Sequence, residues 1–215
     1  MLKKKSNYLP VTQPNGNLVD KKSGELLPVT YFPGRPLQYR FDASRGVFNI
    51  RGETVLTKPR EAFEIIPVAY RIFADNILGV GMKKWAEFFF LNEERQLCNL
   101  LLHGYSVQNL MQVVADRMFY DHVKLTEVRL KISPVQKESK SPGAEGKKYH
   151  IASFDYERIS PEEVSTLQHA VKGLQIWRED TNTGAGETQF AENYSPPVFE
   201  EVPEGAAYHA LGDEE

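Results

Sequence analysis

Aromatic and basic side chains lie close together at several points of this 215-residue chain, a combination suited to contact with nucleic-acid bases and phosphates. The densest example starts at Lys83-Lys84-Trp85 and extends to Phe89. A base of any identity can stack on an aromatic ring, while Lys and Arg follow the phosphates. Because side chains alternate along a strand, Trp85 and Phe89 share one face. We expect that face to stack bases and the opposite face to fill the core.

Side chains of the same two kinds occur on the neighbouring predicted strands and loops. The candidate nucleic-acid contacts are Tyr70, Arg71, Lys83, Lys84, Trp85, Phe89, His103, Tyr105, Arg129, Lys131, Lys137, Lys140, Lys147, Lys148 and Tyr149. Each has a structural alternative, since aromatic residues in strands often form the core and lysines often coat a solvated surface.

The residues that enzymes use for catalysis do not occur in recognisable patterns. The five histidines, at positions 103, 122, 150, 169 and 209, have no metal-ligand spacing, and a single cysteine excludes thiolate metal sites. The glycine-rich run at 79–84 lacks the spacing of a phosphate-binding loop, and no nucleophile elbow surrounds Ser106. We therefore predict a protein that is not an enzyme, with no catalytic residue, no metal site and no cofactor.

The two signs of charge are segregated along the chain, although the formal net charge is only -3. Residues 161–215 hold 2 basic and 12 acidic residues, which leaves 24 basic and 17 acidic residues in 1–160. A basic body attracts phosphate, and an acidic tail competes for the same surface. The alternative is that the acidic tail only keeps the protein soluble.

Hydrophobic periodicity gives the elements that must position these residues. It predicts strands at 47–50, 63–73, 85–91, 97–103, 125–132 and 149–157, and helices at 106–119 and 160–172. Pro67 requires a bulge or an edge position. The polar run 92–95 predicts a hairpin turn, while Ser106 and Ser160 are the expected helix N-caps. The connections 74–84 and 133–148 are lysine-containing loops.

These elements divide the chain into three parts. Residues 1–45 are rich in turn formers and predict an extended basic arm, whose aromatic residues either contact bases or anchor the arm to the domain. Residues 46–175 form the folded domain, which ends with the second helix. Residues 176–215 are acidic and poor in apolar side chains, which predicts a disordered acidic tail.

Residues 63–157 follow the order β-β-β-α-β-β, which resembles the oligonucleotide- and oligosaccharide-binding fold, or OB-fold. The resemblance implies a mainly β protein with two helices, built on an OB-fold-like five-stranded barrel. It also implies that a ligand lies across the second and third of these strands, between the basic loops 74–84 and 133–148.

The whole layout resembles the single-stranded-DNA-binding proteins of bacteria and phages, in which a flexible acidic tail follows an OB-fold body. The resemblance implies sequence-tolerant binding of single-stranded DNA in replication, recombination or repair, by a phage- or plasmid-encoded protein. It also implies that the tail recruits replication or repair proteins. Here the chain ends in Gly212-Asp213-Glu214-Glu215, without the aromatic residue common at such tail tips, which departs from the pattern. RNA as the ligand and homo-oligomer formation both remain open.

Two other functions are compatible with the same features. One is an interaction adaptor or inhibitor whose acidic tail mimics nucleic acid, and the other is a virion structural protein. No apolar stretch approaches a membrane span, and the basic start lacks the apolar region of a signal peptide. With the lone Cys98, which fits a reducing compartment, this predicts a cytoplasmic protein without a membrane partner, in the host cytoplasm if it is phage-encoded.

Overall fold

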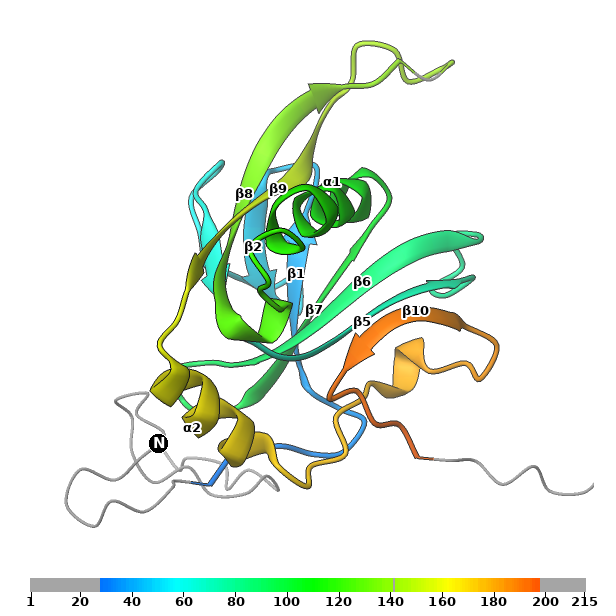
Figure 1. Ribbon diagram of the computed structural model, residues 1–215. Coiled ribbons are helices and arrows are strands. Elements are labelled where there is room, and N and C mark those ends of the chain that lie inside the picture. Colours follow the sequence, from blue (N-terminus) through cyan, green and yellow to red (C-terminus); the bar gives the residue numbers. More distant parts are fainter. Residues whose placement is uncertain (1–27, 141, 198–215) are drawn as a thin grey trace, which may run out of the picture.

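The computed structural model describes residues 28–140 and 142–197, which form two β-sheets and two α-helices (Figure 1). The larger sheet has seven strands in the order β10-β5-β6-β7-β1-β2-β3. They span Glu187–Glu192 (β10), Pro67–Asp75 (β5), Lys83–Leu91 (β6), Leu97–His103 (β7), Leu37–Asp42 (β1), Val47–Ile50 (β2) and Thr54–Val55 (β3). Strands β1 and β7 are parallel and the other neighbours antiparallel, so the sheet is mixed.

The smaller sheet has the order β4-β8-β9 and consists of Phe63–Ile65 (β4), Val128–Glu138 (β8) and Lys148–Arg158 (β9). Its two long strands form a hairpin that rises above the rest of the molecule in Figure 1. The predicted loop 133–148 is therefore much shorter than expected, because the alternating pattern of β8 continues to Glu138.

A break at Pro67 divides the predicted strand 63–73 between the two sheets. Residues before it pair with β8, and residues after it pair with β6, with a register shift between Pro67 and Ala69. Proline cannot donate to a strand ladder, which is why a bulge was expected here. That prediction is confirmed, and the bend carries the chain from one sheet into the other.

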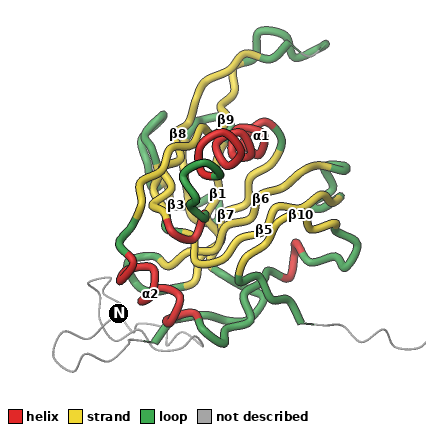
Figure 2. Tube along the Cα trace, in the orientation of Figure 1, coloured by secondary structure: helices red, strands yellow, loops and turns green. Residues whose placement is uncertain are grey.

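The inner face of the large sheet forms the main core. Ala86, Phe88, Leu100 and Leu102 alternate with outward-facing residues on β6 and β7, and all four are buried. They belong to one cluster with residues of the smaller sheet and of helix α1 (Tyr105–Val113). Figure 2 shows α1 between the β8–β9 hairpin and the strands of the large sheet.

Both helices occur where periodicity predicts them, but only one starts with the expected cap. Helix α2 (Pro161–Val171) begins after Ser160, whose Oγ accepts from the N–H of Glu163 at 3.1 Å. Helix α1 begins after Gly104 and continues into a π-helical turn, Val114–Met118. The hydroxyl of Ser106 instead accepts from the N–H of Ala152 at 2.9 Å, so it ties α1 to β9.

The outer face of the large sheet is covered by the segments that were predicted to be an arm and a tail. We call residues 172–197 the strap. Within it Ile176 and Thr181 are buried, and β10 pairs with β5 (Figure 1). Disorder is therefore wrong for residues 176–197, because long-range burial and strand pairing order them. Residues 198–215 of the predicted tail lie outside the described residues.

The predicted arm is likewise part of the sheet in its described portion. Strand β1 lies between β7 and β2, and residues 29–31 are buried. The predicted boundary between arm and domain at residue 45 is therefore wrong, since residues 29–31 and strand β1 already belong to the folded domain. Residues 1–27 of the arm lie outside the described residues.

The mainly β class with two α-helices is confirmed, but the described strands form no closed barrel. Closing a barrel from β5-β6-β7 and β4-β8-β9 would require β7 to pair with β9. Instead β7 pairs with β1, whose own far edge pairs with β2. The large sheet therefore continues outward through β1 and β2.

Candidate nucleic-acid interface

A buried ion pair occupies the outer face of β5 and β6, where the sequence predicts an open binding surface. Arg71 Nε donates to Glu87 Oε2 at 2.8 Å, and their side chains are only 4% and 0% exposed. Glu87 Oε1 also accepts from Asn99 Nδ2 at 3.0 Å and from Thr181 Oγ1 at 2.9 Å. The carboxylate is thus surrounded by donors, as a buried charge requires.

The same arginine is held by the strap. Arg71 Nη2 donates to the carbonyl oxygen of Thr181 at 2.7 Å, and the guanidinium lies 3.7 Å from the ring centroid of Phe73 and 4.4 Å from that of Tyr194. Two cation–π contacts and a desolvated ion pair leave Arg71 no free side for a ligand. The prediction that Arg71 contacts nucleic acid is wrong for this arrangement.

Trp85 and Phe89 do share the outer face, as their spacing predicts, but neither is open to a ligand. Trp85 is 2% exposed and donates through Nε1 to the carbonyl oxygen of Asp75 at 3.0 Å. Phe89 is fully buried in a cluster that includes Tyr31 and Ile176. Their predicted role as a base-stacking platform is wrong here, because Trp85 packs with Phe73 and Ile77, and Phe89 is covered by residues 29–31 and the strap.

Four of the predicted contacts gather at the end of the β5–β6 hairpin: Lys83, Lys84, His103 and Tyr105. Strand register brings them together. Trp85, which follows Lys83 and Lys84, lies opposite His103, and the centroids of the two rings are 5.0 Å apart. Partial burial and the positive charge of Lys83 lower the pKa of His103. Tyr105 is 62% exposed. The loop between β5 and β6 exposes the apolar side chains of Leu78, Val80 and Met82. This end of the sheet combines exposed apolar side chains with cations.

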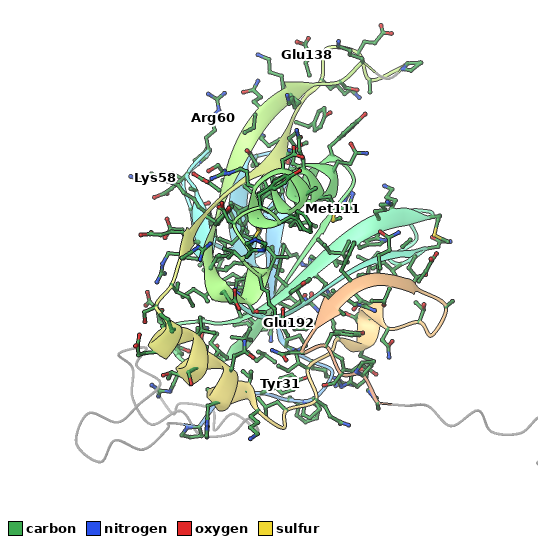
Figure 3. The ribbon with its side chains drawn as sticks, viewed as in Figure 1. Tyr31, Lys58, Arg60, Met111, Glu138 and Glu192 are labelled. Carbon is green, nitrogen blue, oxygen red and sulfur yellow. The ribbon has the colours of Figure 1, made fainter. Side chains whose placement is uncertain are left out.

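Most of the predicted lysines lie near the end of the β8–β9 hairpin. Lys137, Lys140, Lys147 and Lys148 are exposed, and Tyr149 is half-buried opposite Lys137. Figure 3 shows Glu138 toward this end and Arg60 beside β8, where Arg60 donates to the side chain of Gln136. The hairpin thus carries cations away from the body.

Arg129 and Lys131, on the outer face of the small sheet, are flanked by carboxylates. Arg129 lies 3.6 Å from Glu163, and Lys131 is in register with Asp155 on one side and Glu64 on the other. Their charges are therefore largely compensated within the protein. Tyr70 is half-buried against the core, and burial together with the charge of Glu192 raises its pKa. None of these three residues joins the lysine groups.

One further cluster of cations was not recognised from the sequence. We call it the arginine pocket, a concavity of about 550 Å³ beside β1. It is lined by Gly34, Arg35, Pro36, Gln38, Arg40, Arg51, Arg178, Glu179 and Asp180. The four arginines come from three separate parts of the chain, so only the folded protein brings them together.

Two of the four guanidinium groups are paired with carboxylates. Arg35 Nε donates to Glu179 Oε2 at 3.0 Å, and Arg178 Nη2 donates to Asp180 Oδ2 at 3.0 Å. Arg40 donates to the neutral amide of Gln38 at 3.1 Å. Within residues 28–140 and 142–197, neither Arg40 nor Arg51 forms an ion pair, although both are exposed.

Arg178 connects the arginine pocket to the buried ion pair. It is 7% exposed, and its Nη1 donates to Asn99 Oδ1 at 3.1 Å, while the Asn99 amide nitrogen donates to Glu87. Its Nε is a buried donor with no acceptor among the described residues. Buried donors are rarely left unsatisfied, so an acceptor oxygen near this guanidinium would be favourable.

Arg51 is held in an unusual backbone conformation. Its φ is 55° and that of Gly52 is 84°, so both lie in the left-handed region at the turn between β2 and β3. Gly and Asn adopt this region most readily, and a non-Gly residue there stores strain that is common at functional sites. The alternation of Leu37, Tyr39 and Phe41 was a usable signal for β1, and it would have placed Gln38 and Arg40 on one face.

Comparison with protein-family models, curated proteins and solved structures finds no match for this chain. In the part of the chain that the structure describes, no group of three or more His, Cys, Asp or Glu residues could hold a metal ion. No helix in the described ranges has the length and apolarity needed to cross a bilayer.

Proposed function

We propose that this protein binds single-stranded nucleic acid without sequence preference, and that the arginine pocket holds its phosphates. Such a binder would act where strands are exposed, in replication, recombination or repair. We place it in the cytoplasm, or in that of a host if it is phage-encoded. The acidic tail is proposed to recruit partner proteins.

The observation that carries the proposal is a pocket with four guanidinium groups, in which two, those of Arg40 and Arg51, form no ion pair with any described residue. The planar guanidinium fork matches the geometry of phosphate oxygens and binds them through paired hydrogen bonds. Phosphate contacts position a strand but carry no sequence information. Because Trp85 and Phe89 are buried, the proposed contacts are to phosphates and not to bases stacked on these rings.

The strand connections support an OB-type origin for the fold. The bent segment β4–β5 pairs first with β8 and then with β6. If β4–β5 is counted as one strand, α1 follows the third strand, β7, and precedes the fourth, β8. The face of β6 and β7 that binds ligands in that family is covered here by the strap. The proposed site is therefore shifted sideways, onto the part of the same face that β1 and β2 add.

The proposal is tested with the double variant Arg40→Gln, Arg51→Gln. Fluorescence anisotropy of a labelled oligo-dT, measured across a range of salt concentrations, gives the slope of log affinity against log salt. That slope is about -0.7 per neutralised phosphate on a single strand, so the variant should lose about 1.4 from it.

The matched control is Arg129→Gln, Lys131→Gln, which also removes two positive charges. Those cations are flanked by Glu163, Asp155 and Glu64, so the slope should stay that of the unchanged protein. Equal losses in the two double variants would show that only net charge matters. Absence of binding by the unchanged protein at low salt would end the proposal.

A second function is favoured by the exposed apolar residues Leu78, Val80 and Met82, which form a patch at the end of the β5–β6 hairpin. Exposed apolar patches mark protein contacts, and this one supports an interaction adaptor. The adaptor hypothesis predicts no oligonucleotide binding at low salt, so the same titration separates the two functions.

A further inference from the structure

The arginine pocket is bounded by residues that are fixed to one another. The N–H of Glu179 donates to the carbonyl oxygen of Gly34 at 2.8 Å, which ties the strap to the chain before β1. The Asp180 carboxylate accepts from Arg178 at 3.0 Å and from Gln38 at 3.3 Å. These bonds make residues 178–180 one wall of the pocket, beside the strand that carries Gln38 and Arg40.

The turn that carries Arg51 borders the same pocket. The N–H of Arg51 donates to the carbonyl oxygen of Gln38 at 3.0 Å, and Gly52 lies close to Arg40, whose Nη1 is 3.7 Å from the position of an added Cβ. The pocket is therefore bordered by the turn on one side and by the strap on the other. These two borders bring guanidinium groups into the pocket from both sides, Arg51 from the turn and Arg178 from the strap.

The charge of the pocket also exceeds what one internal phosphate requires. Four arginines and two carboxylates line it, an excess of two positive charges. An internal phosphodiester carries one negative charge, whereas a phosphomonoester carries about -1.5 to -2 at neutral pH and presents three terminal oxygens. The charge of the monoester matches the excess of two positive charges in the pocket.

We infer that the arginine pocket receives the terminal phosphomonoester of a nucleic-acid strand in preference to an internal phosphodiester. This inference rests on the proposed function, because it assigns a particular part of the same ligand to the same site. It makes the protein a binder of phosphorylated strand ends as well as of strand backbone.

The test compares three labelled oligo-dT strands of equal length, with a 5′-phosphate, a 3′-phosphate or hydroxyl groups at both ends. Anisotropy titrations with the full chain should show at least one phosphorylated strand binding about tenfold or more tightly than the hydroxyl strand, as expected for added charge-assisted hydrogen bonds. Arg51→Asn should abolish the preference, because Asn accepts the left-handed backbone but removes the guanidinium.

The matched control is Arg60→Asn. Arg60 also has a left-handed backbone, with φ 67°, but it lies beside β8 and not in the pocket (Figure 3). It should keep the preference. Arg40→Gln, which changes no backbone conformation, should abolish the preference again and covers the case in which Arg51→Asn fails to fold.

Equal binding of all three strands overturns the inference and leaves the proposed function standing. Failure of every strand to bind overturns the proposed function as well. Free thymidine monophosphate is included as a competitor, since it carries the same monoester. If it displaces the hydroxyl-ended strand as strongly as a phosphorylated oligo-dT does, the pocket is a nucleotide site and the strand-end assignment is wrong.

Discussion

The outer face of the large sheet has two halves that use arginine in opposite ways. Over β5 and β6, Arg71 is buried, paired with Glu87 and enclosed by the rings of Phe73 and Tyr194. On β1 and at the turn between β2 and β3, Arg40 and Arg51 are exposed and form no ion pair within the described ranges. The strap covers the first half. In the second half only its residues 178–180 are involved, as one side of the arginine pocket.

The covering segment, more than the residue type, decides what an arginine does on this face. Under the strap the local environment is desolvated, so a charge is stable there only with a partner. Beside the strap a guanidinium keeps its hydration and can exchange water for phosphate oxygens. Arg178 belongs to both halves, since it hydrogen bonds to Asn99 on one side and lines the pocket on the other.

The largest expected effect on stability comes from removing the strap. A chain ended after Arg178 loses Thr181, β10 and Tyr194, which cover the ion pair and Phe89. We expect a loss comparable to the whole stability of a domain, about 5–15 kcal/mol, and therefore no cooperative thermal transition by circular dichroism. A chain ended after Pro197 retains every described contact and should melt like the full chain. A cooperative transition at an unchanged Tm in the shorter chain would show that the strap is dispensable.

The next largest effect on stability comes from breaking only the buried ion pair between Arg71 and Glu87. Glu87→Gln leaves the Arg71 charge without a counter-ion, which costs about 3–5 kcal/mol in comparable buried pairs. Arg40→Gln removes an exposed cation and should change the free energy of unfolding by less than about 0.5 kcal/mol. Urea denaturation measures both. Similar midpoints for the two variants would contradict the difference between the two halves.

The smallest effect on stability is expected at the turn between β2 and β3. Arg51→Asn should leave the free energy of unfolding unchanged within about 0.5 kcal/mol, because Asn tolerates a left-handed φ. It should nevertheless weaken oligonucleotide binding, whereas Arg60→Asn should not. Denaturation and anisotropy on the same preparations check this, and a stability loss that parallels the affinity loss would assign Arg51 a structural role.

Local patterns in the sequence predict most of the central strands and both helices, although Leu125–Glu127, expected to start a strand, forms a 3-10 helix before β8. The polar turn at 92–95 sets the β6–β7 hairpin, Ser160 and Pro161 start α2, and Pro67 marks the bend between the sheets. Each depends on residues that are neighbours in the chain. The period of two also assigns Trp85 and Phe89 to one face, as the structure has them.

The segments that cover the face of Trp85 and Phe89 could not be predicted from the alternation of side chains along the strands. Tyr194 is more than a hundred residues from Phe89 in the chain, and its segment, rich in Glu, Thr and Gly, lacks the composition of a core element. Strand β10 is ordered by pairing with β5, and most of its own side chains are exposed. The arginine pocket has the same origin, since its members meet through the β1–β2 and β1–β7 pairings and the strap.

The most direct test of the account follows individual arginines during binding. In the ¹H–¹⁵N spectrum of the full chain, the Nε–H resonances of Arg40 and Arg51 should shift as oligo-dT is added, and the shifts should reverse at high salt. The Arg71 resonance should stay in place, because its Nε–H donates to Glu87 beneath the strap. Shifts of Arg71, with Arg40 and Arg51 unmoved in a strand-bound protein, would contradict the assignment of the open half as the binding site.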